Sequence, residues 1–417
     1  MIIEFTVGNF LSFYEKRTIN FEAKGISELK QNVIKYEKYK LLRSAVIYGA
    51  NSSGKSNLIK ALDKMRDNVL QSVKLNDSDE LDYTPFLFSE ESESNPTFFE
   101  VVFLDNNSNP YRYGFEYNLN AIVNEWLFVG KTPLFLRTKD GIGVSEKFEE
   151  GKGKEVSTND NRLFISLVAQ LGGAVSKQII EWFKNYTILS GLNYQDSSNF
   201  LLKMLHKKSE GSNASLSLFQ TLKLGFKGIE IVESEFNPLD LPKSLSSSLK
   251  SKTIKELMGK TSVKLKTVHN KYDKAGNIIG TVLLDKENNE SEGTNRIMDL
   301  SGLIFDTLAS GKFLVIDELD AKLHPLITIH VVNLFNNPKS NPNNAQLLFS
   351  THDTNLLSAD LFRRDQVWFT EKNEIEQTDL YTLHDINLPD GTKVRNDSNL
   401  EKNYIRGRYG AIPFITN

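Results

Sequence analysis

The first twenty-one residues alternate between apolar and polar side chains, and this pattern predicts short strands. Residues 3–7 and 19–21 carry an apolar residue at every second position, with Gly8-Asn9 after the first segment. Alternate side chains of a strand point to the same face, so each segment would bury one face, and a Gly-Asn pair suits a turn. We therefore expect the fold to open with a sheet.

An uninterrupted apolar run at residues 45–48 leads into a loop that contains two glycines and then into a helical pattern. Between residues 58 and 65 the apolar side chains recur every three or four positions, which is typical of a helix with one buried face. The predicted order is strand, loop and helix.

The middle of the chain predicts a hairpin-rich lobe followed by helices. Three β-like runs between residues 98 and 129 are separated by Asn, Gly and Pro, and apolar residues keep a helical period over 163–183. We expect an N-terminal part with a β-rich lobe, a helical insertion and a C-terminal part, at 1–159, 160–255 and 256–417.

Two further apolar runs, 313–316 and 347–350, have the composition of buried parallel strands. Asp317-Glu318 follows the first run, and Thr351-His352-Asp353 follows the second. Because ligands bind at the carboxyl edge of open α/β sheets, these polar residues are candidates for a shared site. A helical pattern that begins after Ser291-Glu292-Gly293-Thr294 adds a small loop at a positive helix end.

Composition describes an ordinary globular protein. The 417 residues are 39% hydrophobic and 25% charged, and 50 basic against 53 acidic residues leave a net charge of −3, so no attraction of the whole chain to nucleic acid or membrane is implied. Cysteine is absent, which excludes disulfides and thiolate chemistry. No run of about 18 apolar residues occurs. We expect a soluble cytoplasmic protein without a membrane partner.

Lysines gather in one segment. Residues Lys243–Lys271 hold eight lysines and one acid, Glu256. Either this is the solvated face of a surface segment, or it contacts the phosphate backbone of a nucleic acid. The tail 401–417 leaves two similar alternatives: its aromatic and basic residues pack back onto the fold, or they contact nucleic acid or a partner.

The loop Gly49-Ala50-Asn51-Ser52-Ser53-Gly54-Lys55-Ser56 fits the P-loop pattern G-x-x-x-x-G-K-[ST] in full. Its glycines allow backbone N–H groups to point inward at phosphates. Lys55 would reach the β- and γ-phosphates of ATP, and Ser56 would bind Mg²⁺. The remaining predicted nucleotide contacts of this loop and the following helix are Asn51, Ser52, Ser53 and Asn57.

A P-loop predicts a second strand that ends in a carboxylate. Asp317 would hold the Mg²⁺ shell, and Glu318 could polarise the attacking water. His352, at the end of another predicted strand, would hydrogen-bond a γ-phosphate. Glu318, His352 and Lys55 form the predicted catalytic group of an α/β P-loop NTPase, and Ser56 and Asp317 are its predicted metal ligands.

Taken in order, these motifs resemble the head of ABC-type ATPases, over roughly residues 1–70 and 285–360. GANSSGKS, SEGT, FLVIDE, AKLH and STHD occupy the places of the Walker A, signature, Walker B, D-loop and switch-histidine motifs. "VGNFLSF", the SEGT signature, "DELDAKLHP" and "GRYGAIP" further resemble the RloA- and AbiL-like ATPases of bacterial abortive-infection loci, relatives of RecF and SMC heads.

The resemblance implies that two heads close over shared ATP. Each nucleotide would lie between the P-loop of one copy and Ser291 and Gly293 of the other, giving a homodimer or higher homo-oligomer. Residues 9–13 would approach the base or ribose, unless they have an ordinary core or turn role. His324 stands at the D-loop aspartate position, and no glutamine is assigned as a Q-loop.

Three functions remain open at this point. The favoured one is an ATPase that gates a separate effector, a nuclease or toxin, in antiphage defence. The second is a RecF-like DNA-repair or recombination clamp, for which Lys243–Lys271 would line a groove. The third is the nucleotide-binding subunit of a transporter, which the departure from the transporter signature disfavours.

Overall fold

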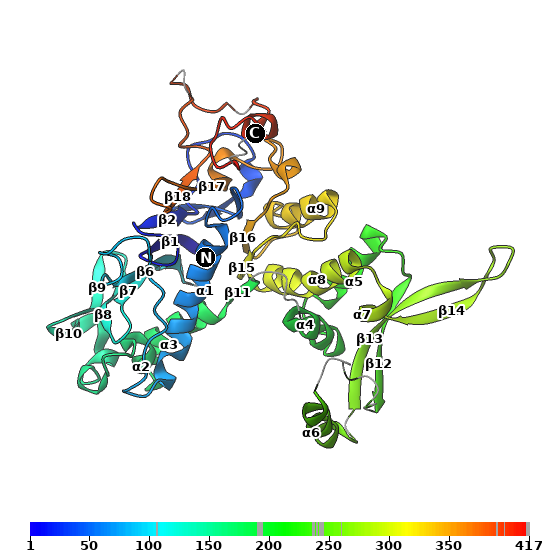
Figure 1. Cartoon of the computed structure of the whole chain (residues 1–417), viewed down its shortest axis with the longest axis horizontal. Coiled ribbons are helices and arrows are strands. Elements are labelled where there is room, and N and C mark those ends of the chain that lie inside the picture. The colour runs from blue at the N-terminus through cyan, green and yellow to red at the C-terminus, as the bar shows by residue number, and fades with distance from the viewer. Residues whose placement is uncertain are drawn as a thin grey trace. The chain divides into compact units, whose positions relative to one another are not determined.

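The computed structural model describes residues 1–105, 107–189, 195–235, 238, 241, 246–259, 261–388, 391–395 and 397–413. The chain divides into two compact units (Figure 1). The first combines Met1–Asn193 with Thr307–Asn417, and the second is Tyr194–Asp306.

A six-stranded sheet forms the centre of the first unit. Its strands run in the order β11 (Tyr186–Leu189), β15 (Phe313–Ile316), β16 (Gln346–Ser350), β5 (Ser44–Tyr48), β17 (Val367–Lys372) and β18 (Thr378–Thr382). All neighbours are parallel except β17 and β18. Every residue of β5, β15 and β16 is buried, which is why their sequences are uninterrupted apolar runs rather than alternating ones.

The second sheet of this unit is antiparallel and has seven strands. They are, in order, β10 (Gly141–Val144), β9 (Thr132–Thr138), β8 (Ile122–Val129), β7 (Pro110–Tyr117), β6 (Thr97–Leu104), β1 (Ile2–Gly8) and β2 (Arg17–Asn20). The expected opening strands therefore pair with each other and with the predicted hairpin lobe. A separate hairpin, β3 (Val33–Tyr36) and β4 (Tyr39–Leu42), follows β2 in the sequence.

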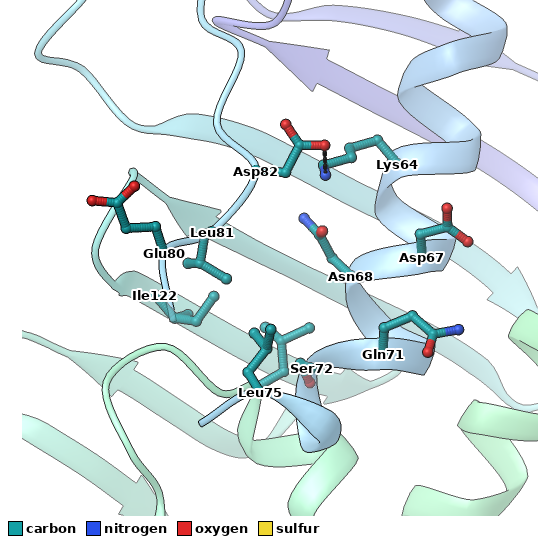
Figure 2. Close-up of a pocket in the computed structure, with 11 residues that line it drawn as sticks. Lys64, Asp67, Asn68, Gln71, Ser72, Leu75, Glu80, Leu81, Asp82 and Ile122 are labelled. Atoms are coloured by element: carbon teal, nitrogen blue, oxygen red, sulfur yellow. Dashed lines mark hydrogen bonds and ion pairs between the residues drawn. The ribbon is translucent and has the colours of Figure 1, made fainter. Parts of the chain in front are cut away.

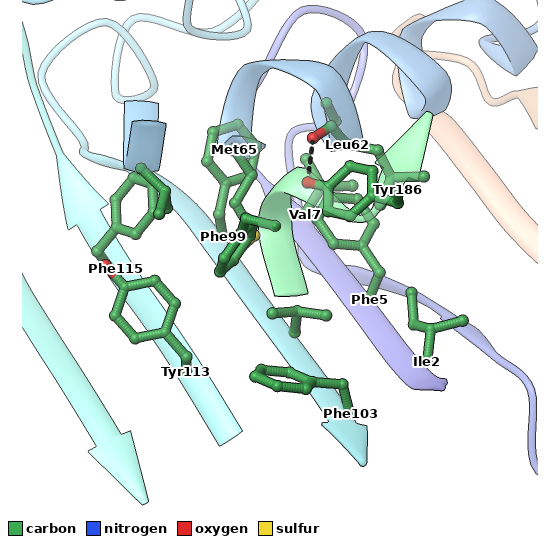
Figure 3. Packing of buried hydrophobic residues seen from close by; sticks show 14 of the residues in the cluster. Ile2, Phe5, Val7, Leu62, Met65, Phe99, Phe103, Tyr113, Phe115 and Tyr186 are labelled. Carbon is green, nitrogen blue, oxygen red and sulfur yellow. Dashed lines mark hydrogen bonds between the residues drawn. The ribbon is translucent and has the colours of Figure 1, made fainter. Parts of the chain in front are cut away.

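The helix after the P-loop, α1 (Lys55–Gln71), contributes to one core with the antiparallel sheet. Figure 3 shows Leu62 and Met65 of α1 beside Phe99 of β6, and the Tyr186 hydroxyl donates to the Leu62 carbonyl at 3.2 Å. This packing fixes the helix that carries the P-loop lysine. The remaining helices of the unit are α2 (Phe164–Gln170), α3 (Ala174–Lys184), α9 (Pro325–Asn336) and α10 (Leu400–Ile405).

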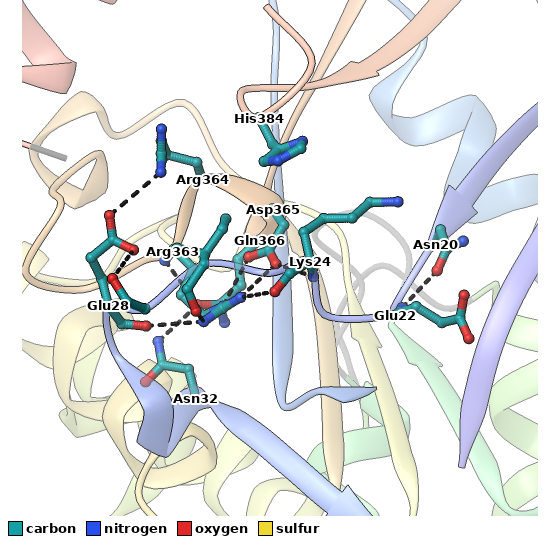
Figure 4. A network of polar contacts seen from close by, with 12 residues as sticks. Asn20, Glu22, Lys24, Glu28, Asn32, Arg363, Arg364, Asp365, Gln366 and His384 are labelled. Carbon is teal, nitrogen blue, oxygen red and sulfur yellow. Dashed lines mark hydrogen bonds and ion pairs between the residues drawn. The ribbon is translucent and has the colours of Figure 1, made fainter. Parts of the chain in front are cut away.

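A buried ion pair anchors the segment that leads into β17. The guanidinium of Arg363 donates to Asp365 at 2.7 Å, and both side chains are 1% exposed. The same guanidinium donates to the carbonyls of Ile26 and Glu28 at 3.1 and 2.9 Å (Figure 4). Arg363 thus ties the loop before β3 to the start of β17, which pairs with the P-loop strand.

The second unit is a three-stranded antiparallel sheet with helices. Its strands are β12 (Gly228–Glu235), β13 (Thr261–Tyr272) and β14 (Ile278–Asp285), and its helices are α4 (Gln195–His206), α5 (Ser212–Leu222), α6 (Ser247–Leu257), α7 (Lys286–Asn289) and most of α8 (Glu292–Ser310). Leu201 and Phe219 pack with Leu265 of β13 and Met298 of α8 in its own core.

The unit boundaries differ from the expected helical insertion at 160–255. The second unit covers 194–306 and includes three strands, whereas the helices between 164 and 184 belong to the first unit. Phe164 and Phe183 are fully buried in the core of the first unit. A helical apolar period shows that a helix buries one face, but it does not show which part of the chain covers that face.

Candidate functional site

The P-loop begins directly after β5, and its shape depends on backbone angles that favour glycine. Gly49 has φ +154° and Gly54, which precedes α1, has φ +112°. A Cβ on Gly54 would collide with the side chain of Thr378, and one on Gly49 would lie 2.5 Å from Ser53 Oγ. The two glycines of the motif are therefore required by both conformation and space.

The side chain of Lys55 hydrogen-bonds to the backbone of its own loop. Its Nζ donates to the carbonyls of Gly49 at 2.8 Å and Ala50 at 3.0 Å, and the residue is 5% exposed. Burial lowers the pKa of Lys55 from 10.5 to about 8, although the charges of Asp317 and Glu318 act in the opposite direction. A buried cation of this kind favours an anionic ligand, which would offset the cost of burial.

The two acids after β15 are held by one hydroxyl of the neighbouring strand. Ser350 Oγ lies 2.5 Å from Asp317 Oδ1, and the Glu318 backbone N–H donates to the same Ser350 oxygen at 2.8 Å. Asp317 is 4% exposed. Glu318 has φ +55°, an uncommon angle for a residue other than glycine. Ser350 thus orients both carboxylate-bearing residues, and the sequence analysis did not identify it.

His352 follows β16, between the ends of β15 and β5 in the sheet order. Burial and the Lys55 charge lower the pKa of His352, while Asp320, Glu318 and Asp317 oppose this shift. All four charges act on the imidazole, so the site gathers the predicted lysine, acids and histidine. The sheet places β5, β16 and β15 side by side, and their carboxyl ends form this group.

Side chains distant in sequence support the loop from the other side. Ser53 Oγ lies 2.6 Å from Thr370 Oγ1 of β17, and Thr378 Oγ1 of β18 lies 3.0 Å from the Ser53 carbonyl oxygen. Ser12 receives a hydrogen bond from Asn57 Nδ2 at 2.8 Å and lies 2.7 Å from Thr378 Oγ1. Isolated threonines belong to no motif, so no local pattern predicts these two contacts.

Residues 44–358, most of the chain, match the family described as "AAA domain, putative AbiEii toxin, Type IV TA system". The chain belongs to this AAA-domain family. The predicted α/β P-loop ATPase fold is confirmed, and the expected RloA- or AbiL-like specificity stays a prediction. No curated protein matches the chain.

Among solved structures, the chain is similar to the SMC head domain from Thermotoga maritima, with 12% identity, a TM-score of 0.41, and coverage of 91% of this chain and 98% of that chain. A structure of the recombination mediator protein RecF has 12% identity, a TM-score of 0.36, and coverage of 91% and 98%. An SMC head bound to the C-winged helix domain of ScpA has 14% identity, a TM-score of 0.37, and coverage of 91% and 97%.

The other predicted nucleotide contacts lie in the P-loop with the start of α1, and at the start of α8. Asn51 and Ser52 are exposed in the loop, and Ser56 is half-buried in the first turn of α1. Ser291 and Gly293 lie in the second unit, where Ser291 Oγ accepts from the Thr294 N–H at 3.1 Å. Asn9 and Phe10, expected near a base or ribose, are buried.

His324, at the expected D-loop aspartate position, has a structural contact. Its Nδ1 accepts the Leu326 N–H at 3.2 Å and so caps α9. Among the described residues there is no cluster of three or more His, Asp or Glu side chains that could hold a metal ion. No described helix is long and apolar enough to cross a membrane.

The tail packs onto the fold in the part that is described. The rings of Tyr404 and Tyr409 lie 5.4 and 6.1 Å from Phe369 of β17, and both tyrosines are buried. This is the packing alternative of the sequence analysis. Residues 414–417, like Lys243 at the start of the lysine-rich segment, lie outside the described residues.

Proposed function

We propose that the chain is an ATPase that binds Mg²⁺·ATP at the P-loop and hydrolyses it to ADP and phosphate. The observation that carries this proposal is the meeting of three neighbouring strand ends, which gathers Lys55, Asp317, Glu318 and His352. The family description of an AAA domain supports the same conclusion.

The residues fit a triphosphate and a magnesium ion. Lys55 Nζ bonds to two carbonyls of its own loop, and these are contacts that phosphate oxygens would replace. Ser56 and Asp317 offer the hydroxyl and carboxylate oxygens that Mg²⁺ prefers. The ion would neutralise charge that develops on the phosphates.

Glu318 and His352 act in the hydrolysis step. Glu318 polarises a water molecule, which attacks the γ-phosphorus while the bond from that phosphorus to the ADP oxygen breaks. His352 contacts the γ-phosphate and donates to it through one ring N–H; in the empty site, burial and the Lys55 charge lower the pKa of His352. Gly49 and Asn51 through Asn57 surround the phosphates.

Two copies complete the site in this proposal. Ser291 and Gly293 of one copy contact the γ-phosphate held by the P-loop of the other, so ATP joins the heads and hydrolysis separates them. The result is a homodimer or a larger homo-oligomer whose closure gates a separate effector, a nuclease or toxin, in the bacterial cytoplasm. The family description, which includes a putative toxin and a toxin–antitoxin system, supports a defence role of the RloA or AbiL kind.

A RecF- or SMC-like clamp that binds nucleic acid through Lys243–Lys271 is the second candidate. One observation weighs against it. Lys266 of β13 lies in register between Glu230 of β12 and Asp285 of β14, so carboxylates on both sides offset its charge. A lysine between two acids contributes little to a phosphate-binding groove.

The hydrolytic role of Glu318 is tested by phosphate release. We expect Glu318→Gln to bind ATP with Mg²⁺ but to lose at least about 100-fold in turnover, the scale of general-base catalysis. The matched control, Glu374→Gln, changes an exposed acid in the turn after β17 and should retain wild-type turnover. Unchanged turnover of Glu318→Gln would contradict this role.

Head pairing is tested with the same variant. With ATP and Mg²⁺, Glu318→Gln should accumulate a paired state that Ser291→Arg abolishes, because the larger side chain blocks the partner's γ-phosphate. Analytical ultracentrifugation with and without ATP measures the pairing. If ATP binds tightly and neither the mass nor the sedimentation coefficient changes, the two-headed arrangement is wrong.

A further inference from the structure

The outer strand of the second unit has an open edge. In the sheet order β12, β13, β14, the last strand pairs only with β13, from Lys266↔Asp285 to Tyr272↔Ile278. Within the described part of the chain, no strand pairs with the other side of β14. That side presents a row of backbone N–H and C=O groups that can pair with another strand.

The exposed strand is also unusually apolar. Residues 278–284 read IIGTVLL and contain no charged side chain. Figure 1 shows the far end of the β13–β14 hairpin without a helix packed against it. Five apolar residues of the hairpin are exposed: Tyr272 (56%), Ile278 (59%), Ile279 (59%), Val282 (40%) and Leu283 (39%).

Proteins usually protect such edges with charged residues, prolines or bulges. The outer strand lacks the first two over 278–284, and its bulge, with Ile279 as the extra residue opposite Lys271 and Tyr272, lies beside the hairpin turn and away from residues 281–284. A strand rich in β-branched residues and without charge pairs readily with another strand. The edge therefore has the composition of an interface and not that of a solvated surface.

The charges at the two ends of β14 identify the partner strand. Lys271 and Lys274 lie at the turn with one acid, Asp273, whose carboxylate accepts the Ala275 and Asn277 N–H groups at 2.9 and 2.8 Å, so the turn keeps a net positive charge. Exposed Glu287 lies at the opposite end, beside Asp285, whose charge is offset in part by Lys266 of β13.

The charges at one end of the hairpin are opposite in sign to those at the other end, so two antiparallel copies have complementary charges. An antiparallel second copy brings the basic turn of each hairpin beside the acidic end of the other, and the uncharged residues 278–284 pair in the middle. A parallel copy would place like charges together. Opposite charges across strands stabilise a sheet, whereas like charges destabilise it.

We propose that two copies of this chain associate through antiparallel pairing of their β14 strands, which joins two three-stranded sheets into one six-stranded sheet. The interface is isologous, because each copy contributes the same strand. It requires no nucleotide and does not depend on the proposed ATPase activity. The chain would then have two self-association surfaces, one at the nucleotide site and one at β14.

Val282→Lys tests this interface in the full chain. A lysine in the middle of the edge introduces two like charges at the centre of the antiparallel pair. Without nucleotide, the wild-type chain should sediment at about twice 47.3 kDa and the variant at 47.3 kDa. Ile375→Lys, at another exposed apolar residue (51%) that lies in the first unit, is the matched control and should remain dimeric.

Circular dichroism separates loss of pairing from loss of folding. Val282 is exposed, so the variant should unfold at the wild-type temperature once the wild type is also diluted to monomers. A monomeric wild type at micromolar concentration, or a Val282→Lys chain that stays dimeric, would overturn the proposal.

Single cysteines test the strand direction, because the natural chain has none. In an antiparallel pair, the Cα atoms of Thr281 in the two copies lie within about 7 Å, whereas those of Lys274 at the turn lie more than about 30 Å apart. Thr281→Cys should therefore cross-link with a short bis-maleimide and Lys274→Cys should not. Cross-linking of Lys274→Cys instead would show parallel pairing and contradict the proposal.

Discussion

The lowered pKa of Lys55 predicts that ATP affinity depends on pH. Without nucleotide, burial holds the pKa of Lys55 at about 8, compared with 10.5 for a free lysine. That difference corresponds to about 3 kcal/mol by which the empty loop disfavours the charged form. Phosphates favour the charged form, so the pKa should rise when ATP binds, and binding above pH 8 should take up a proton.

The magnitude follows from the fraction of Lys55 that is charged. With a pKa of about 8, roughly nine-tenths of the free protein carries the charge at pH 7 and roughly one-tenth at pH 9. If only the charged form binds, the dissociation constant for ATP should rise about tenfold from pH 7 to pH 9. Isothermal titration calorimetry with Mg²⁺ at several pH values measures this change. Repeating the titration at pH 8.5 in two buffers of different ionisation heat measures the proton uptake.

Lys55→Arg is the control, because a guanidinium stays charged throughout this range. Its affinity for ATP should be weaker, since the longer planar group fits the loop less well, but it should not change between pH 7 and 9. Burial and the Lys55 charge lower the pKa of His352 in the empty site, and the Lys55→Arg variant keeps any proton uptake by His352 while it removes that by Lys55. A wild-type affinity that is flat over this range, without proton uptake, would refute the placement of phosphates at Lys55.

Three other substitutions have definite expected outcomes. Gly54→Ala should abolish ATP binding in calorimetry and lower the free energy of unfolding by more than about 1 kcal/mol, because its φ is +112° and its Cβ would meet Thr378; normal ATP affinity would contradict this. Ser350→Ala should slow phosphate release and cost about 1–3 kcal/mol in urea unfolding, since it removes the Ser350 hydrogen bond to the buried Asp317 carboxylate; unchanged turnover would exclude an orienting role. Arg363→Ala should lower stability by about 3–5 kcal/mol by leaving Asp365 buried without its partner, and a loss below 1 kcal/mol would show that water reaches the site.

Much of the central sheet was predictable because its strands are buried on both faces. The runs at 45–48, 313–316 and 347–350 lie in β5, β15 and β16, and the predicted site residues follow the ends of these strands, whereas their roles stay predictions. Local sequence encodes these features directly, through apolar composition and the glycines of the P-loop. The alternating pattern likewise predicted β1 and β2.

The parts that were missed depend on contacts between distant segments. Thr370 and Thr378 hydrogen-bond to Ser53 of the P-loop because β17 and β18 lie beside β5 in the sheet. No local sequence pattern predicts such a contact for a threonine. Ser350 is similar, since its hydroxyl matters only because β15 is the next strand. The second unit, 194–306, differs from the expected insertion at 160–255 for the same reason: a helical apolar period does not show which segment packs against the helix.

The most direct test of the central claim is an experimental structure of Glu318→Gln with ATP and Mg²⁺. We expect phosphate oxygens within hydrogen-bond distance of Lys55 Nζ, the ion between Ser56 and Asp317, and His352 at the γ-phosphate. A nucleotide bound elsewhere, or a P-loop that keeps Lys55 on the carbonyls of Gly49 and Ala50 with ATP present, would contradict it.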